Sequence, residues 1–191
     1  MPMKIFENKI ICIVLMVVLI AGGLFIGGMK GLNSLYGDSE DVFFIGIDKD
    51  GICVANDMTE RVSAATNMVT IARKYEATAP AACRQAITYV TTSAASLESA
   101  LAARSISDAV SANKILDMSV TDLYRELENL SLSVKDSDYI QSLYADFNSR
   151  NDTISHDPYN QYATEYMQAL DDFPADLIAS VMPVKTASTA Y

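Results

Sequence analysis

The segment from Ile10 to Met29 holds no charged residue over twenty positions, IICIVLMVVLIAGGLFIGGM. An α-helix rises about 1.5 Å per residue, so twenty residues cover the roughly 30 Å hydrocarbon core of a bilayer. The sequence therefore predicts a transmembrane helix at 10–29, preceded by a short head at 1–9. A cleaved signal peptide is the alternative. Signal h-regions are usually about 7–15 residues long, so the length of this run favours an uncleaved anchor.

The charges on either side of this run indicate its orientation. Lys4, Lys9 and the amino terminus precede it, whereas Asp38, Glu40 and Asp41 follow it. Positive charge flanking a span is typical of the cytoplasmic side. We therefore expect a single-pass protein of the cell membrane, with a cytoplasmic N-terminus and a larger extracytoplasmic domain. The expected partner of residues 10–29 is the lipid bilayer.

The rest of the chain is acidic. Residues 1–30 hold only three of the 14 basic and one of the 24 acidic side chains, which leaves a net charge of −12 on residues 31–191. Such a surface repels nucleic acid, and we expect no nucleic-acid partner. Cys53 and Cys83 are predicted to be free thiols, because a helix over residues 54–76 would hold them on the order of 35 Å apart.

From residue 54 onward, apolar residues recur at steps of three and four, which indicates amphipathic helices. Asn56 or Asp57 is expected to cap the first helix, Pro80 to begin the second, and Ser105 or Ser107 to begin the third. The predicted fold is all-α: the membrane helix and then an up-down antiparallel bundle of about four helices, with coiled-coil-like packing, over residues 54–182. Residues 183–191 are expected to form a loose tail.

The juxtamembrane segment 30–53 has a different pattern. Asp41–Ile47 is rich in β-branched and aromatic residues, and Asp48–Gly51 resembles a turn. This pattern is compatible with a small β-hairpin near residues 42–54. In the last helix, Pro158 leaves two alternatives open, a kink or a new helix capped by Asp157.

Aromatic residues recur every seven positions near the C-terminus, at Tyr159, Tyr166 and Phe173. A buried tyrosine packs its ring and directs its hydroxyl to a partner. This face is therefore interpreted either as core packing or as a groove for a partner helix or peptide. Asn160, on the same helix, is a candidate to satisfy buried hydroxyls or carbonyls.

These positions also resemble the end of the LemA family. The resemblance rests on Tyr159-Asn160, Tyr166 and Phe173-Pro174 at the family's spacing. Further positions that fit the family pattern are Arg61, Asn67, Tyr75 and Lys135. The chain departs from the pattern at Thr66 and Pro158, so it resembles a divergent member. The resemblance implies a membrane-anchored helical bundle, and it implies fold and anchoring more strongly than any activity.

The sequence contains no pattern that is typical of a catalytic or metal-binding site. His156 is the only histidine, and no phosphate-binding loop or dinucleotide fingerprint is present. We expect no enzyme activity, cofactor or metal. The predicted function is a membrane-anchored scaffold or protein-interaction module, in membrane or envelope organisation, which binds an unknown protein or itself. The alternative is an extracytoplasmic ligand-binding sensor that signals through an accessory protein.

Overall fold

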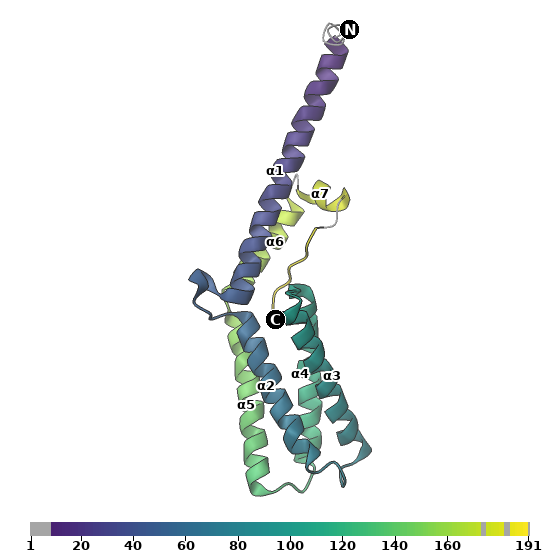
Figure 1. Cartoon of the computed structure of the whole chain (residues 1–191), viewed down its shortest axis with the longest axis vertical. Coiled ribbons are helices and arrows are strands. Elements are labelled where there is room, and N and C mark those ends of the chain that lie inside the picture. Colours follow the sequence, from purple (N-terminus) through teal and green to yellow (C-terminus); the bar gives the residue numbers. More distant parts are fainter. Residues whose placement is uncertain (1–8, 173–174, 182–183, 191) are drawn as a thin grey trace.

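The computed structural model describes residues 9–172, 175–181 and 184–190, and in these residues the chain is all-α (Figure 1). A long helix, α1, leads through a 3-10 turn, η2, into a series of shorter helices. Their bounds are α1 Lys9–Ile45, η2 Ile47–Lys49, α2 Val54–Arg73, α3 Ala81–Ala102, α4 Ile106–Glu128, α5 Val134–His156, α6 Tyr159–Asp171 and α7 Ala175–Val181.

Helices α2 to α5 form an up-down bundle in which consecutive helices run antiparallel (Figure 1). The predicted apolar stripes form its core, which includes Met58, Val90, Leu116 and Phe147. Each helix hides the apolar side that it would otherwise expose to water, and this burial is the main force that assembles the bundle. The predicted antiparallel bundle is therefore confirmed.

The starts of the helices follow the sequence signals in part. Pro80 precedes α3 and Ser105 precedes α4, as predicted. The prediction for α2 was wrong, because this helix begins at Val54 after Cys53. The amide of Asn56 instead donates to the carbonyl of Gly51 at 2.6 Å, and Asp57 pairs with Arg150 across the bundle. Both side chains therefore lie within the first turn of α2 rather than before it.

The expected β-hairpin near residues 42–54 is absent, and no strand occurs in the described part of the chain. Helix α1 continues through Ile45, and η2 follows it. The reason is tertiary packing: Val42 and Phe43 are buried, and the Phe43 ring meets the Tyr159 ring edge-on at 4.9 Å between centroids. Burial against α6 thus outweighs the local strand preference of this segment.

Helix α1 has two parts with different surroundings. Its first part projects alone from the molecule (Figure 1). The large apolar side chains of this part, from Ile11 to Leu24, are exposed. This helix is long and apolar enough to cross a membrane, a property that a signal sequence shares. Its second part carries a stripe with alternating steps of four and three, which is typical of coiled-coil packing. The stripe contains Phe25, Met29, Leu32, Tyr36, Ser39 and Phe43, all buried or partly buried.

Helix α6 runs antiparallel to this second part of α1 (Figure 1). Tyr166 meets Tyr36 edge-on at 5.6 Å between ring centroids, and Tyr159 meets Phe43 in the same way. The two ring pairs are seven residues apart on both helices, so they fix the register of α6 against α1 at two points along the contact. The region predicted as one bundle at 54–182 therefore has two parts, because α6 and α7 pack on α1 while α2 to α5 pack on one another.

Candidate functional site

The face of α6 that the sequence singled out packs its tyrosine rings on α1 and directs its polar groups to the chain's own C-terminal segment. The hydroxyl of Tyr159 donates to the carbonyl of Ser188 at 2.7 Å, and that of Tyr166 donates to the carbonyl of Lys185 at 2.6 Å. The side-chain oxygen of Asn160 accepts the backbone N–H of Ala190 at 2.8 Å. We call residues 184–190 the tail, and the three side chains that bind it, those of Tyr159, Asn160 and Tyr166, the α6 groove.

The tail contains no helix or strand, yet it is not loose as predicted. Ala187 and Ala190 are buried, and Val184 packs against the core. All three groove side chains bind atoms of the tail's main chain rather than of its side chains. The groove therefore recognises an extended backbone with small side chains at two positions three residues apart.

The junction between α5 and α6 sets the position of the groove. Helix α5 ends at His156 and a new helix starts at Tyr159, so the chain does not continue as one kinked helix; the N-cap position of the new helix is Pro158 rather than Asp157. Asp157 accepts the N–H of Tyr159 at 2.8 Å through its carboxylate. The amide of Asn160 donates to the carbonyl of Ile154 at 2.8 Å, so this residue satisfies the end of α5 while it holds the tail.

Burial shapes the electrostatics of the groove. It raises the pKa values of the Tyr159 and Tyr166 hydroxyls above the usual value, so both groups stay protonated and act as donors. Burial also raises the pKa of Asp157, and the nearby carboxylates of Asp57 and Asp50 raise it further.

A small charged cluster fastens the tail to α1. The ammonium group of Lys185 lies 3.7 Å from a carboxylate oxygen of Glu40 and 4.7 Å from the centre of the Tyr36 ring. Glu40 also accepts from the Nε of Arg104 at 3.0 Å, and the Arg104 guanidinium lies over the Phe44 ring at 4.4 Å. Glu40 thus joins the tail, α1 and the α3–α4 turn at one point.

Phe173 and Pro174, the remaining members of the predicted face, lie outside the described residues. The positions that carried the family resemblance elsewhere are spread over two further places. Tyr75, Asn67 and Lys135 lie where the end of α2 meets the start of α5, whereas Arg61 lies inside the bundle. The structure does not bring these four residues together with the α6 groove.

At the α2–α5 contact, Asp136 is the central residue, and the sequence analysis did not select it. The Tyr75 hydroxyl donates to its carboxylate at 2.7 Å, and the Lys74 ammonium group lies at 2.8 Å from it. Ser133 caps α5 by accepting the Asp136 N–H at 3.1 Å. The Lys74 ammonium, followed by the Tyr75 hydroxyl, lowers the pKa of Asp136 to about 2. The spacing Ser-x-x-Asp before an apolar stripe is the signal that could have found it.

Arg61 is fully buried between three helices. It donates to the side-chain oxygen of Asn113 at 2.5 Å and to the carboxylate of Asp117, both on α4. Its guanidinium carbon lies 3.9 Å from the centre of the Phe147 ring on α5. Burial lowers the pKa of Arg61, and Asp117 offsets part of this shift. This arrangement explains Asn113, which interrupts the apolar stripe of α4.

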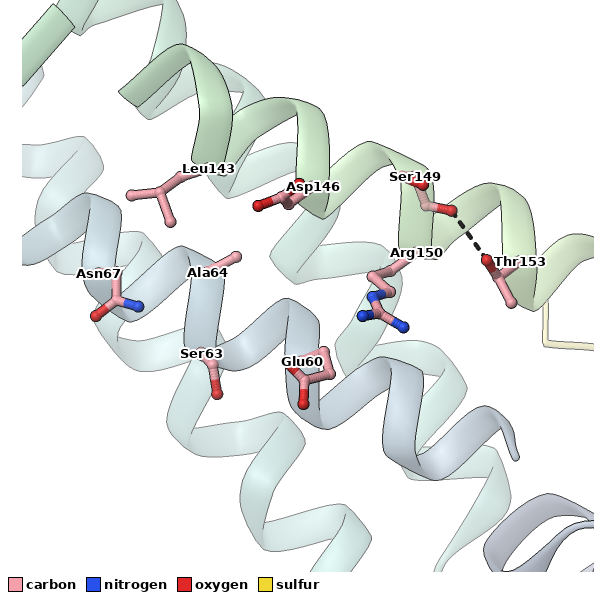
Figure 2. Close-up of a pocket in the computed structure, with 9 residues that line it drawn as sticks. All are labelled: Glu60, Ser63, Ala64, Asn67, Leu143, Asp146, Ser149, Arg150 and Thr153. Carbon is pink, nitrogen blue, oxygen red and sulfur yellow. Dashed lines mark hydrogen bonds between the residues drawn. The ribbon is translucent and has the colours of Figure 1, made fainter. Parts of the chain in front are cut away.

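A groove of about 360 Å³ runs along the outer contact of α2 and α5. Figure 2 shows Glu60 and Asn67 on its α2 side and Asp146 and Arg150 on its α5 side. The Arg150 guanidinium binds Asp57 at 2.9 Å, so its charge is already paired. The remaining charges on the groove are those of the two carboxylates.

The cysteines and the histidine are not part of these sites. Cys53 and Cys83 are buried and are not joined to each other, as predicted. Exposed His156 lies 3.5 Å from a carboxylate oxygen of Asp152. Among residues 9–172, 175–181 and 184–190, no three side chains of the metal-binding types cluster closely enough to hold an ion.

Comparisons with known proteins do not assign the chain to a family. No family model matches its sequence, and no curated protein or solved structure is similar enough to count as a match. The resemblance to the LemA family therefore stays a prediction.

Proposed function

We propose that this protein is a single-pass, membrane-anchored scaffold whose helical bundle presents an interaction surface outside the cytoplasm. The observation that carries the proposal is the two-part character of α1. Its exposed apolar side chains precede, in one continuous helix, a stripe that is buried against α6. Exposed apolar surface of this extent is costly in water, and a lipid bilayer removes that cost.

The chemistry of the described sites supports a role in binding rather than in catalysis. Tyr159, Tyr166 and Asn160 hold main-chain atoms, and Arg61 is enclosed in the core. These groups hold the tail on α6 and helices α2, α4 and α5 on one another, which is what a rigid interaction module requires. The resemblance to the LemA family, in which members are anchored helical bundles, points in the same direction.

Alkaline extraction of membranes that contain the full chain tests the anchor. The protein should stay with the membrane, and its mass should include residues 1–30. Replacing both Leu19 and Ile20 with arginine should release it, since each arginine at a helix centre costs roughly 2.5–3.5 kcal/mol on insertion. Leu35→Arg is the matched control, because Leu35 is exposed on the same helix but outside the predicted span. A wild-type protein that is extracted, or that has lost its first thirty residues, would refute the anchor.

Protease treatment tests the orientation. The protease is added to cells whose cell wall or outer membrane has been removed but whose cytoplasmic membrane is still sealed. The bundle should then be cleaved, whereas an epitope tag placed before residue 9 should be protected. The opposite result would place the bundle in the cytoplasm.

The groove between α2 and α5 favours a second candidate function, a ligand-binding sensor. Its free volume and the carboxylates of Glu60 and Asp146 suit a small cationic or hydrogen-bonding molecule. A thermal-shift screen with small polyamines and amino acids tests this candidate. Stabilisation that is lost in Glu60→Gln would support it, and an unchanged melting temperature across the screen would count against it.

A further inference from the structure

The tail is bound in a way that does not depend on its belonging to the same molecule. Three of its contacts with the α6 groove are hydrogen bonds to its main chain, at Lys185, Ser188 and Ala190. Its buried side chains are the methyl groups of Ala187 and Ala190, and Val184 packs partly exposed against the core. The same main-chain bonds are open to any extended segment with small residues at these positions, and a second copy of this chain carries that segment together with Lys185 and Val184.

The net free energy that holds the tail on the α6 groove is also small. Holding seven residues in one extended conformation costs backbone entropy at each position. The gains that offset it are few, because alanine buries little apolar area and each hydrogen bond replaces one with water. The ion pair of Lys185 with Glu40 is exposed on the lysine side, so it adds little. The tail therefore exchanges with solvent far more readily than a helix of the bundle.

We propose that the α6 groove also binds the tail of a second copy, so that neighbouring anchored molecules are linked tail to groove. This inference rests on the proposed function, because the membrane supplies the conditions for exchange. Anchored copies share one orientation, and their grooves lie at the same height above the bilayer. Confinement to the membrane plane raises the local concentration of tails around each groove.

Each molecule offers one tail and one groove. Two copies can therefore exchange tails reciprocally, as in a domain-swapped dimer, or pass them along a row.

The ion pair of Lys185 and Glu40 provides a direct readout of a seated tail. A carbodiimide activates the Glu40 carboxylate, and the Lys185 amine then forms an amide bond with it while the carbodiimide takes up the elements of water. The full chain is prepared with ¹⁴N and with ¹⁵N, mixed in equal amounts, reconstituted in phosphatidylcholine vesicles and treated with this reagent. Mass spectrometry of the digest then shows whether the linked Lys185 and Glu40 peptides come from one molecule or two.

If tails exchange completely, about half of the Lys185–Glu40 links should carry one light and one heavy peptide. Any reproducible mixed-isotope fraction above that of a sample mixed after quenching supports the inference. Links of a single isotope only would overturn it. Flotation of the same vesicles tests the anchor separately. Protein that floats with lipid but gives only single-isotope links refutes tail exchange alone, whereas protein that leaves the lipid refutes the proposed function and the exchange that rests on it.

Two variants control for chance proximity. Ala187→Arg combined with Ala190→Arg places large charged side chains where only methyl groups fit, and should lower all Lys185–Glu40 links at least tenfold. Thr186→Arg is the matched control, since Thr186 is exposed in the same segment, and should leave them unchanged. Mixed-isotope links that persist undiminished in the double variant would show that they arise from collision and would overturn the inference.

Discussion

Removing the buried guanidinium of Arg61 tests how the bundle is held together at its centre. Arg61 is 0% exposed and its partner Asn113 is 2% exposed, whereas the side chain of Asp117 is 42% exposed. Arg61→Ala leaves a cavity and deprives the Asn113 amide of its partner. Asp117 can return to water at little cost. The damage is therefore expected to come from the cavity and from Asn113.

The magnitude follows from these two contributions. Truncating a long buried side chain to alanine costs about 2–5 kcal/mol, and an unsatisfied buried amide costs about 1–3 kcal/mol. Relief of the desolvation of Arg61 offsets part of this sum. We expect a loss of about 3–5 kcal/mol in the free energy of unfolding. For a chain of this length that loss lowers the melting temperature by roughly 6–20 °C.

A double-mutant cycle separates the pair from the cavity. Arg61→Met keeps most of the volume, and Asn113→Leu removes the partner, so each single variant strands one polar group. The double variant strands neither, and replacing a buried polar pair with apolar groups is often close to neutral. We expect a coupling energy of about 1–3 kcal/mol. It is measured by thermal unfolding of the detergent-solubilised full chain, followed by circular dichroism at 222 nm. Effects that add to within about 0.5 kcal/mol would refute the direct interaction.

Three further predictions concern other parts of the fold. Asp136→Asn should lower the melting temperature at pH 7. The pKa of the Asp136 carboxyl is 3.8 in the unfolded chain and about 2 in the folded one, so its stabilising contribution is present above pH 3.8 and is lost as the pH falls through 2. The variant should therefore lose less stability than the wild type over this acid range, as measured by melting curves at a series of pH values. Gly46→Ala should cost about 1–3 kcal/mol, because Gly46 has φ +89 and a Cβ there would clash with the carbonyl oxygen of Ile52. Gly51→Ala, with φ +79 and open space around it, should cost less in the same denaturant titration. Tyr159→Ala should cost about 3–5 kcal/mol because its ring is buried against Phe43, whereas Tyr159→Phe should cost only about 0.5–1.5 kcal/mol and make the tail more sensitive to carboxypeptidase. Equal effects of the two Tyr159 variants would contradict this division.

The bundle could be predicted from sequence because its helices carry their own signals. In α4, Val110, Leu116 and Leu123 recur on one side, and these residues are buried. Periodicity of this kind reports which side of a helix faces inward, whatever it packs against. The same reasoning could not assign neighbours, so it did not show that α6 leaves the bundle and packs on α1.

The segment before α2 was predicted less well, for a physical reason. Val42, Phe43 and Phe44 have side chains that suit a strand, and locally nothing opposes one. What decides their conformation is the stripe that begins at Phe25 and continues through Tyr36, which requires α1 to stay helical down to Phe43. A pattern spread over about five turns of the helix outweighs the preference of a few adjacent residues.

The site shows the same limit. The sequence selected Tyr159, Asn160 and Tyr166 as one face but left open what covers it. The tail carries no pattern that could identify it as the occupant, because the groove binds its main chain, which every sequence shares. Recognition of this kind leaves a signal in the receptor and almost none in the ligand.

The continuity of α1 links the two halves of the proposed function. A helix without a break fixes the direction of every side chain at about 100° per residue, so the stripe that seats α6 has a set orientation relative to the exposed apolar residues from Ile11 to Leu24. The α6 groove is built on that stripe through the Tyr36–Tyr166 and Phe43–Tyr159 contacts. It follows that the groove cannot turn independently of the first part of α1. If α1 spans the bilayer, every copy presents its groove at the same height and the same tilt, which is the arrangement that tail exchange between neighbours requires.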